Sequence, residues 1–303
     1  MRYIRWFVLL ALLLSLTVAV SAQEMNDMAL CDTVDTPELA PSAGVRAMMV
    51  LGGLQSGDIS AAETFVSADT YIQHNLSAPD GLDGLLGVIP LAAEGGASSV
   101  NFHRVLVQGN LVALHTSYNL PIFGGELVGF DIFRFDEDGQ IVEHWDNLMP
   151  VAEPNPGGHT QTDGSVTITG LDRTQANCEK VVEFVTRALV TPDPELDITQ
   201  YINPASYTQH NPAVADGLEG FGAFLQSLAE NNQVIAYSQI HLVVAQGNFV
   251  LIASEGVFGD ADNPTPTAFY DLFRLEDGLI VEHWDVISPI PPQEEWVNQN
   301  GKF

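Results

Sequence analysis

The sequence is poor in basic residues: ten Lys and Arg stand against 39 Asp and Glu, and the formal net charge is −29. A surface this acidic repels phosphate backbones and anionic lipid headgroups, so nucleic-acid binding is not expected. The chain also lacks the glycine-rich phosphate loops, dinucleotide fingerprints and serine-nucleophile motifs of other enzyme classes. The composition and the missing motifs therefore argue against these classes of function, but they do not identify the function.

Long apolar runs are missing everywhere except at the N-terminus. There, two arginines precede an almost unbroken apolar run over residues 7–20, and small residues end at Ala22. This pattern predicts a signal peptide over residues 1–22, cut after Ala22, and hence a secreted or periplasmic protein. The alternative is a membrane anchor, but about 14 apolar residues fall short of the roughly 20 that span a bilayer. The mature protein is expected to be free of the membrane.

Cysteine is scarce, with Cys31 and Cys178 only. In an exported chain the two residues can form a disulfide or remain as two thiols, and the sequence leaves both alternatives open. A catalytic cysteine is not expected, because no histidine-containing motif accompanies either residue.

What the chain does contain is a repeat. Five motifs recur in the same order, at spacings from 136 residues (Tyr71 to Tyr207) to 140 residues (Asp131 to Asp271). They read Tyr-x-Gln-His-Asn, Asp-Gly-Leu-x-Gly, Gln-Gly-Asn, Asp-x-Phe-Arg and Ile-Val-Glu-His-Trp-Asp. Solenoid units are only about 20–50 residues long, so the spacing indicates a duplicated domain. A Pro- and Gly-rich stretch separates the copies, and the predicted organisation is domain 1 over 23–153, a linker over 154–170 and domain 2 over 171–303.

Each copy places helices first and strands last, which predicts an α+β fold of two tandem cones with helices packed on a curved antiparallel sheet. Four strands joined by glycine-containing hairpins end each copy. The aspartates that open the last helix of each copy, Asp80 and Asp216, are expected to cap free N–H groups. The remaining elements are helices over 45–54, 59–67, 178–189 and 195–202, and short strands at Tyr71–Gln73 and Tyr207–Gln209.

The last hairpin of each copy carries the polar residues. A two-residue turn at Asp138-Gly139 would pair Asp131 with Asp146, and alternation would place both on one face with His144. Arg134 and Glu143 would form an ion pair on the opposite face, together with Ile141 and Trp145.

In the second copy, a three-residue loop over 276–278 would place Asp271, His283 and Asp285 on a common face. A two-residue turn at Asp277-Gly278 would separate the two carboxylates by parity.

Carboxylates among apolar side chains are costly to bury, and burial raises an aspartate pKa toward the range useful for proton abstraction. The alternative is structural: His144 and His283 would only hydrogen-bond an aspartate or a carbonyl and close the cone. Both interpretations stand at the level of sequence.

The motif series resembles the SnoaL-like proteins, predicted aldol-condensation enzymes of the NTF2-like superfamily, which also holds ketosteroid isomerase and polyketide cyclases. The resemblance covers about 40–150 and 175–290, and it implies an apolar pocket between helices and sheet. By this resemblance Asp146 and Asp285 are the acid/base residues, assisted by His144 and His283. Asp131 and Asp271 stand where the cyclase pattern has histidine, which departs from the cyclase mechanism. The expected substrate-binding residues are Tyr71, His74, Asn75, His103, His115 and Asp131 in the first copy, and Tyr207, His210, Asn211, His241 and Asp271 in the second.

The expected function is therefore cofactor-independent acid/base chemistry on a small apolar carbonyl compound: aldol condensation, isomerisation or cyclisation. The alternative is a non-catalytic binding or interaction module, because this superfamily contains both. No metal site is expected, since no tight ligand spacing such as His-x-x-x-His occurs, although the histidines and aspartates of one cone offer a weaker alternative. The two copies are expected to pair as an intramolecular pseudo-dimer. The first is slightly favoured for activity, because it has His115 where the second has Ala253.

Overall fold

The computed structural model describes residues 30–33, 39–40, 42–95 and 97–303. The predicted signal peptide, residues 1–22, lies outside the described residues. The chain forms two compact units, each built around one repeat. The first-repeat unit contains Thr33–Ala152, Gly164–Val166 and Val286–Phe303. The second-repeat unit contains Glu153–Asp163 and Thr167–Asp285, together with the segment around Cys31.

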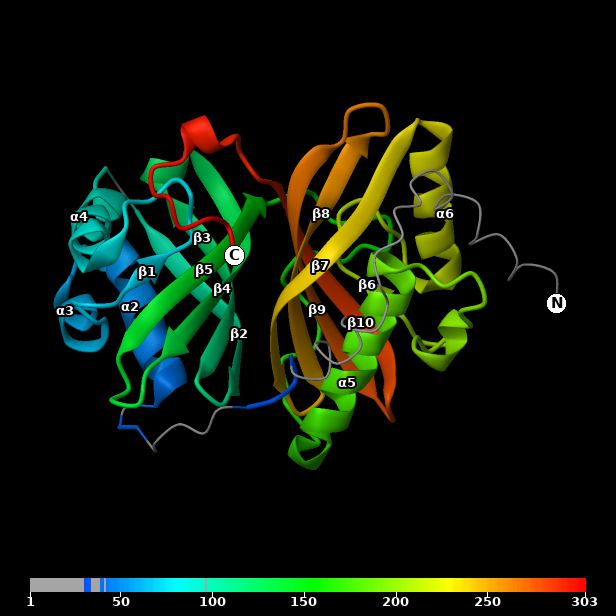
Figure 1. The fold of residues 1–303 in the computed structure, drawn as a ribbon, viewed down its shortest axis with the longest axis horizontal. Coiled ribbons are helices and arrows are strands. Elements are labelled where there is room, and N and C mark those ends of the chain that lie inside the picture. Colours follow the sequence, from blue (N-terminus) through cyan, green and yellow to red (C-terminus); the bar gives the residue numbers. More distant parts are fainter. Residues whose placement is uncertain (1–29, 34–38, 41, 96) are drawn as a thin grey trace. The chain divides into compact units, whose positions relative to one another are not determined.

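The first-repeat unit packs three helices on one face of a five-stranded sheet of order β1-β5-β4-β3-β2 (Figure 1). β1 runs parallel to β5 and the remaining pairs are antiparallel. Its core lies between the helices and the sheet, with Ala47, Ile89 and Phe133 almost fully buried. The elements are α2 (Ala43–Ser56), α3 (Ser60–Phe65), β1 (Ile72–Gln73), α4 (Gly81–Ala93), β2 (Ser99–Gln108), β3 (Leu111–Leu120), β4 (Gly125–Phe135) and β5 (Ile141–Pro150).

The second-repeat unit has the same sheet order, β6-β10-β9-β8-β7, again with its short first strand parallel to the last. The α+β prediction is thereby confirmed in both copies. The elements are α5 (Thr174–Val185), a single π-helical turn (Thr186–Val190), β6 (Thr208–Gln209), α6 (Gly217–Glu230), β7 (Gln233–Gln246), β8 (Phe249–Asp260), β9 (Thr265–Glu276) and β10 (Leu279–Pro289).

Two local predictions are wrong for physical reasons. The expected helix over 195–202 is a single 3₁₀ turn, Ile198–Gln200, because the Asp197 side chain accepts the backbone N–H of Thr199 and forms a local turn that competes with a helix. The expected caps fail because Asp80 and Asp216 make no side-chain hydrogen bond to their helices. Their Oδ1 atoms instead accept the backbone N–H of Gln73 and Gln209, each at 2.9 Å. Each aspartate thus fixes the backbone of the glutamine that stands two residues after the motif tyrosine.

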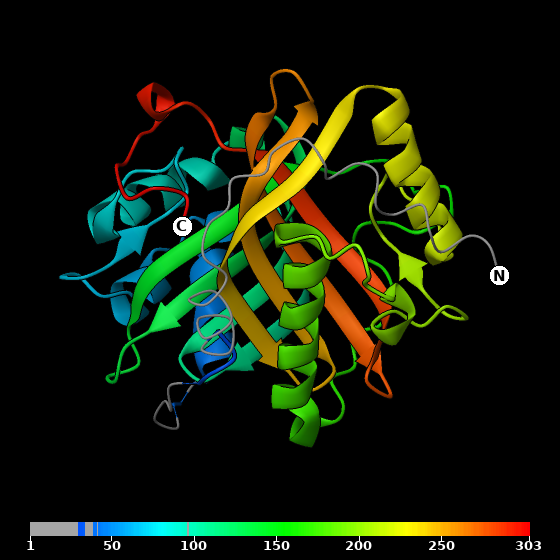
Figure 2. The same cartoon turned by 45° about the vertical axis from the view of Figure 1, so that its right-hand side comes forward.

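Two extended segments, which we call straps, pack on these units. The linker strap, Glu153–Asp163, belongs to the second-repeat unit, where Asn155 Nδ2 donates to the carbonyls of Gln209 (2.6 Å) and Val214 (2.9 Å). The C-terminal strap, residues 291–303, belongs to the first-repeat unit and runs beside β1 and α4 (red in Figure 2). Each strap therefore follows one repeat in sequence and completes the unit of the other.

The C-terminal strap uses the same kind of contact as the linker strap. Asn298 Nδ2 donates to the carbonyls of Asn75 (2.7 Å) and Ala78 (3.0 Å). The ring of His74 then meets Gly301 O at 2.9 Å, just as His210 meets Thr160 O at 2.8 Å. The histidine contact is the same in both units, so Gly301 and Thr160 mark corresponding strap positions.

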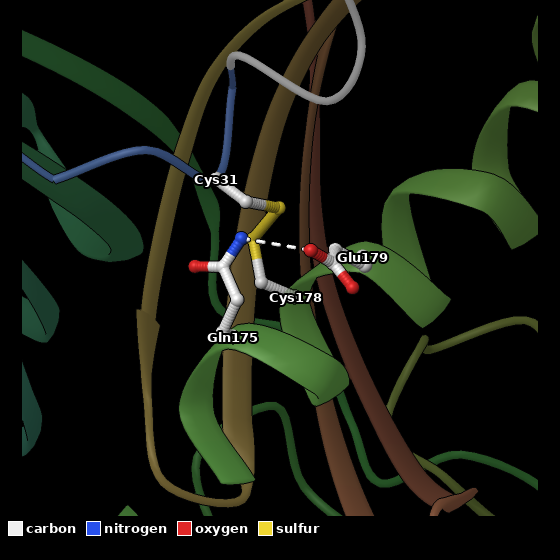
Figure 3. The surroundings of a disulfide bond; sticks show 4 residues. All are labelled: Cys31, Gln175, Cys178 and Glu179. Carbon is white, nitrogen blue, oxygen red and sulfur yellow. Dashed lines mark hydrogen bonds between the residues drawn. A yellow bond between two sulfur atoms is a disulfide. The ribbon is translucent and has the colours of Figure 1, made fainter.

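Cys31 and Cys178 form a disulfide that joins the segment before the first repeat to α5 (Figure 3). The first of the two alternatives left open by the sequence is the one observed. Both cysteines are fully buried, and beside them Gln175 Nε2 donates to Glu179 Oε1 at 2.9 Å (Figure 3). In the described part of the chain, none of the helices has the length and hydropathy needed to span a bilayer.

Candidate functional site

The first hairpin has the predicted pairing but not the predicted turn. Asp131 faces Asp146 and Arg134 faces Glu143, as alternation requires. The loop, however, is closed by the backbone bond from Asp136 to Gln140 at 2.9 Å and holds three residues, not two. A one-residue shift beyond Arg134 compensates.

This shift changes the face of one strand residue. Ile141 pairs with Phe135 and is fully buried in the helix-facing core, whereas it was expected on the opposite face. The irregularity lies between Ile141 and Glu143, and His144 keeps the predicted face.

The second hairpin also differs from expectation. β9 ends at Glu276 and β10 begins at Leu279, with Asp277 (φ 49°) and Gly278 (φ 76°) both in the left-handed region. This is a two-residue turn, so the expected three-residue loop is wrong. His283 Nε2 nevertheless lies 3.0 Å from Asp271 Oδ1, on the same face. A one-residue irregularity between the turn and His283 must therefore restore the parity, as in the first hairpin.

The polar residues of the first repeat form a buried chain of hydrogen bonds behind the helices. Tyr118 OH donates to Asp131 Oδ2 at 2.6 Å, and Asp131 Oδ1 lies 3.3 Å from His144 Nε2. The other ring nitrogen of His144 lies 3.1 Å from Gln73 Oε1, and Gln73 Nε2 donates to Tyr71 OH at 3.1 Å. Asp131, His144 and Gln73 are at most 6% exposed. Both nitrogens of His144 thus face oxygen acceptors.

The second repeat contains the same chain. His283 lies between Asp271 Oδ1 (3.0 Å) and Gln209 Oε1 (3.0 Å), and Gln209 Nε2 donates to Tyr207 OH at 3.2 Å. Burial alone would lower the pKa of His283, but the hydrogen bond to Asp271 and the charges of Asp285 and Asp271 raise it overall. The structure therefore favours a charged imidazole between two acceptors.

The proposed acid/base aspartates sit beside these chains, each held by an asparagine. Asn75 Nδ2 donates to Asp146 Oδ2 at 2.6 Å, and Asn211 Nδ2 lies 2.8 and 3.0 Å from the two oxygens of Asp285. Both aspartates are buried, at 6% and 7% exposure. The motif tyrosine, the asparagine and the two aspartates of each repeat thus gather on one face, together with His144 in the first repeat and His283 in the second.

One contact is supplied from different strands in the two repeats. Asp131 takes its phenol from Tyr118 on β3, which pairs with Val100 of β2. Asp271 takes its phenol from Tyr237 on β7, at 3.1 Å, and Tyr237 pairs with Gly256 of β8. In the second repeat the tyrosine lies on the neighbouring strand, β7, and Gly256 of β8 occupies the position equivalent to Tyr118. Both repeats thus have a hydrogen bond from a tyrosine to this aspartate, although the two tyrosines stand at different positions.

The two sites differ in charge. Lys302 of the C-terminal strap is partly buried, with its side chain 13% exposed; it donates to Asp146 O and places Nζ 3.6 Å from Asp146 Oδ1. Burial lowers the pKa of Lys302, while the Asp146 carboxylate opposes that change. In the linker strap the corresponding residue, one after Thr160, is the neutral and buried Gln161.

Asp285 has a raised pKa. Burial, chiefly, raises its pKa from 3.8 to about 6; His283 opposes the change and Asp271 adds to it. Burial and nearby carboxylates also raise the pKa of Tyr207 and Tyr71, so both phenols remain protonated donors at neutral pH.

Several predicted site residues lie elsewhere. His74 and His210 are on the outer face, where their Nε2 atoms meet Glu143 and Glu282 at 3.0 Å. They follow the inward-facing glutamine by one residue, and alternation turns them away. Their rings stack on the tryptophans of the last strands, at 5.0 and 4.5 Å between centroids. The predicted Arg–Glu pairs lie on this face as well, at 2.8 Å in the first repeat and 2.6 Å in the second.

The strand histidines also lie off the site. His115 pairs with Phe130, next to Asp131 in sequence, and therefore faces the other way; it stacks on that ring at 4.4 Å. His103 meets Ser117 Oγ at 2.9 Å, and His241 meets Glu255 Oε2 at 3.2 Å. The extra histidine that favoured the first repeat is thus not at its site.

Sequence reasoning missed three kinds of site residue. Gln73 and Gln209 could have been found, since they stand two residues from the motif tyrosines and share their face by alternation. Tyr118 and Tyr237 occupy non-equivalent positions, so comparison of the repeats does not find them. Lys302 belongs to no repeated motif.

The described residues include three groups whose donor atoms lie within 4.8 Å of one another, close enough for a metal ion. Two of them are the buried site residues themselves. The third group joins His159 and Asp163 of the linker strap to His210, and it was not anticipated from the sequence.

Comparison with known proteins identifies the family. The model of the SnoaL-like domain matches residues 45–144 and 181–283, which are 100 and 103 of the 303 residues. No curated protein matches the chain.

Solved structures similar to part of the chain include a steroid delta-isomerase from Pseudomonas aeruginosa (23% identity, 36% of this chain and 80% of that one, TM-score 0.30). They also include an epoxide hydrolase from M. tuberculosis (20%, 35% and 82%, 0.31) and a predicted polyketide cyclase from Streptomyces antibioticus (21%, 35% and 91%, 0.31). These similarities concern the fold.

Proposed function

Because the chain belongs to the SnoaL-like domain family in both repeats, we propose that it carries out general acid/base chemistry on a small apolar carbonyl compound, chiefly in the second repeat. One observation carries this proposal: Asp285 is buried beside the His283–Asp271 pair, with a pKa raised to about 6. A base with a pKa near neutrality can both accept and return a proton during turnover.

The geometry supports a simple proton transfer. Asp285 removes a proton from the carbon next to the carbonyl; the C–H electron pair forms a carbon–carbon double bond, and the π pair of the carbonyl moves to its oxygen. Tyr207 can stabilise that oxygen, because its own oxygen accepts from Gln209 and its O–H remains for donation. The proton on Asp285 then returns to carbon or to the oxygen, so no oxidant or cofactor is required. His283, held by Asp271, keeps a positive charge near the developing enolate.

The first repeat favours the alternative, ligand binding without proton transfer. Asn75 holds one oxygen of Asp146, and Lys302 lies beside the other. The corresponding position of the linker strap, beside the second repeat, holds the neutral Gln161. We therefore propose that the first repeat binds a ligand and does not react with it.

Export is part of the proposal. Residues 1–22 have the pattern of a cleaved signal peptide. The Cys31–Cys178 disulfide is of the kind that persists in oxidising compartments.

The test is exchange of carbon-bound hydrogen with solvent deuterium, followed by NMR over a panel of ketones and enolisable esters. The Asp285→Asn variant is expected to lose exchange by at least about 100-fold, whereas Asp146→Asn retains it. Circular dichroism would establish that both variants fold. Exchange at the wild-type rate in the double variant would remove the proposed base, and loss confined to Asp146→Asn would reverse the assignment of the two repeats.

A further inference from the structure

The linker strap brings two of its side chains to a histidine of the second-repeat unit. His210 Nδ1 lies 2.7 Å from Asp163 Oδ1, and His159 Nδ1 lies 3.8 Å from Asp163 Oδ2. The two imidazole rings are 5.3 Å apart between centroids. One aspartate thus presents an oxygen to each of two histidines, and the donor atoms of all three residues lie within 4.8 Å of one another.

The second nitrogen of each histidine also meets a carboxylate. His159 Nε2 lies 3.2 Å from Asp216 Oδ2, and His210 Nε2 lies 3.0 Å from the buried Glu282 Oε1. Metal-ligating histidines characteristically donate their far N–H to a carboxylate, which fixes the ring and raises the basicity of the ligating nitrogen. Both histidines have this outer partner in place, with the nearer nitrogens turned toward Asp163.

The three side chains of the cluster differ in their exposure to solvent. The side chain of His210 is fully buried, whereas those of His159 and Asp163 are 33% and 44% exposed. The backbone carbonyl of Asp163 is held by Trp284 Nε1 at 3.0 Å, so the strap is fixed where its carboxylate is needed. Thr160 O, 2.8 Å from His210 Nδ1, is the other oxygen at that nitrogen. The cluster is therefore anchored on one side and open to solvent on the other.

The first-repeat unit provides an internal comparison. Asn300 stands one residue before Gly301, as His159 stands one before Thr160, and Asn300 Nδ2 donates to Asp80 Oδ1 at 2.7 Å. That contact is equivalent to the one between His159 and Asp216. An asparagine thus satisfies the structural role of this position, which leaves the imidazole at 159 as an addition specific to the linker strap.

From these observations we propose that His159, Asp163 and His210 bind a divalent transition-metal ion that fastens the linker strap to the second-repeat unit. Two imidazole nitrogens and one carboxylate suit Zn²⁺, or Co²⁺ and Ni²⁺ in its place, and disfavour Ca²⁺ and Mg²⁺, which prefer oxygen ligands. Water from the solvent side would complete the coordination. The net charge of −29 raises the local concentration of cations around the chain.

The proposal is tested by titrating metal-stripped full-length protein with Zn²⁺ in a calorimeter, and with Co²⁺ while recording its visible absorption. The wild type is expected to bind one ion tightly, with the intense visible bands of a four-coordinate Co²⁺ site. His159→Asn copies residue 300 and keeps the contact to the Asp216 carboxylate, so it should fold normally and bind at least about 100-fold more weakly. Asp163→Asn should behave likewise.

Asp285→Asn and Asp146→Asn serve as controls for the two buried sites, and both are expected to bind like the wild type. Equal affinity in His159→Asn and wild type would overturn the proposal. Loss of binding in a control variant but not in His159→Asn would also overturn it, because the ion would then lie in a buried site. Binding weaker than millimolar in the wild type would show that the cluster is only a hydrogen-bonded anchor. None of these outcomes depends on the proposed acid/base function.

Discussion

Replacing Asp285 with asparagine should make the second repeat more stable at neutral pH and leave its stability almost unchanged in acid. A carboxylate whose pKa rises on folding binds its proton more tightly in the folded state, so its contribution to stability falls as pH rises through the interval from 3.8 to about 6. At pH values above this interval, the rise in pKa lowers the free energy of unfolding by roughly 3 kcal/mol. The variant lacks this cost, and the difference in unfolding free energy between variant and wild type should therefore grow between pH 4 and pH 7.

The charged and titratable groups around Asp285 set the size of the effect. Asp271 adds to the cost of the charge, whereas His283 offsets part of it, and the pKa of about 6 already includes both effects. Asn211 can still donate to the amide oxygen of the new side chain. The variant should therefore not lose its gain in stability by leaving the Asn211 amide without a hydrogen-bond acceptor.

Urea unfolding of both proteins at several pH values between 4.5 and 8 measures the difference directly. Asp146→Asn is the matched control, and it should change stability in the opposite direction at neutral pH, because it leaves the partly buried Lys302 amine without its carboxylate. Parallel stability curves for Asp285→Asn and wild type would refute the reasoning, since they would mean that burial imposes no net penalty on the charge. A stabilising Asp146→Asn would refute the claimed difference between the two sites.

Three further outcomes are expected. Tyr118→Phe should cost about 1–3 kcal/mol in urea unfolding, because the buried Asp131 loses a 2.6 Å donor; a change below experimental error would contradict the importance of that bond. Reduction of the Cys31–Cys178 disulfide should lower the thermal midpoint, since a cross-link between residues 147 apart is worth up to about 5 kcal/mol in the chain-entropy description, and an unchanged midpoint in reductant would contradict this. Lys302→Met should destabilise the first repeat by a few kcal/mol at pH 7 through the unpaired carboxylate it leaves, and proteolysis of the C-terminal strap would report the loosening, whereas wild-type resistance would count against an ion pair there.

The sequence predicts the layout of each cone well because alternation along strands is a strong rule. It placed Asp131, His144 and Asp146 on one face, where they are found, although the turn that led to this expectation was wrong. A one-residue irregularity in the strand offset the error, and such irregularities have no marker in a single sequence. The same rule, applied to β1 and to β3, would have turned His74 and His115 away from the site.

Other parts of the site could not be predicted from the sequence. The linker strap looks like a turn-rich spacer because it is rich in Pro and Gly, and nothing local shows that Asn155 satisfies carbonyls about 55 residues away. Lys302 reaches Asp146 from 156 residues downstream. Tyr118 and Tyr237 supply one contact from different strands, so aligning the repeats hides their equivalence. Long-range contacts made by unrepeated residues leave no periodic pattern to detect.

The exchange of straps between repeats also bears on synthesis of the chain. Ribosomes release a protein from its N-terminus, and domains usually fold in that order. Here the carbonyls of Asn75 and Gln73 accept hydrogen bonds from Asn298 and Asn300, which are translated after the whole second repeat. The second-repeat unit, by contrast, receives its strap before its own first helix is translated. The copy that is translated first is therefore completed last.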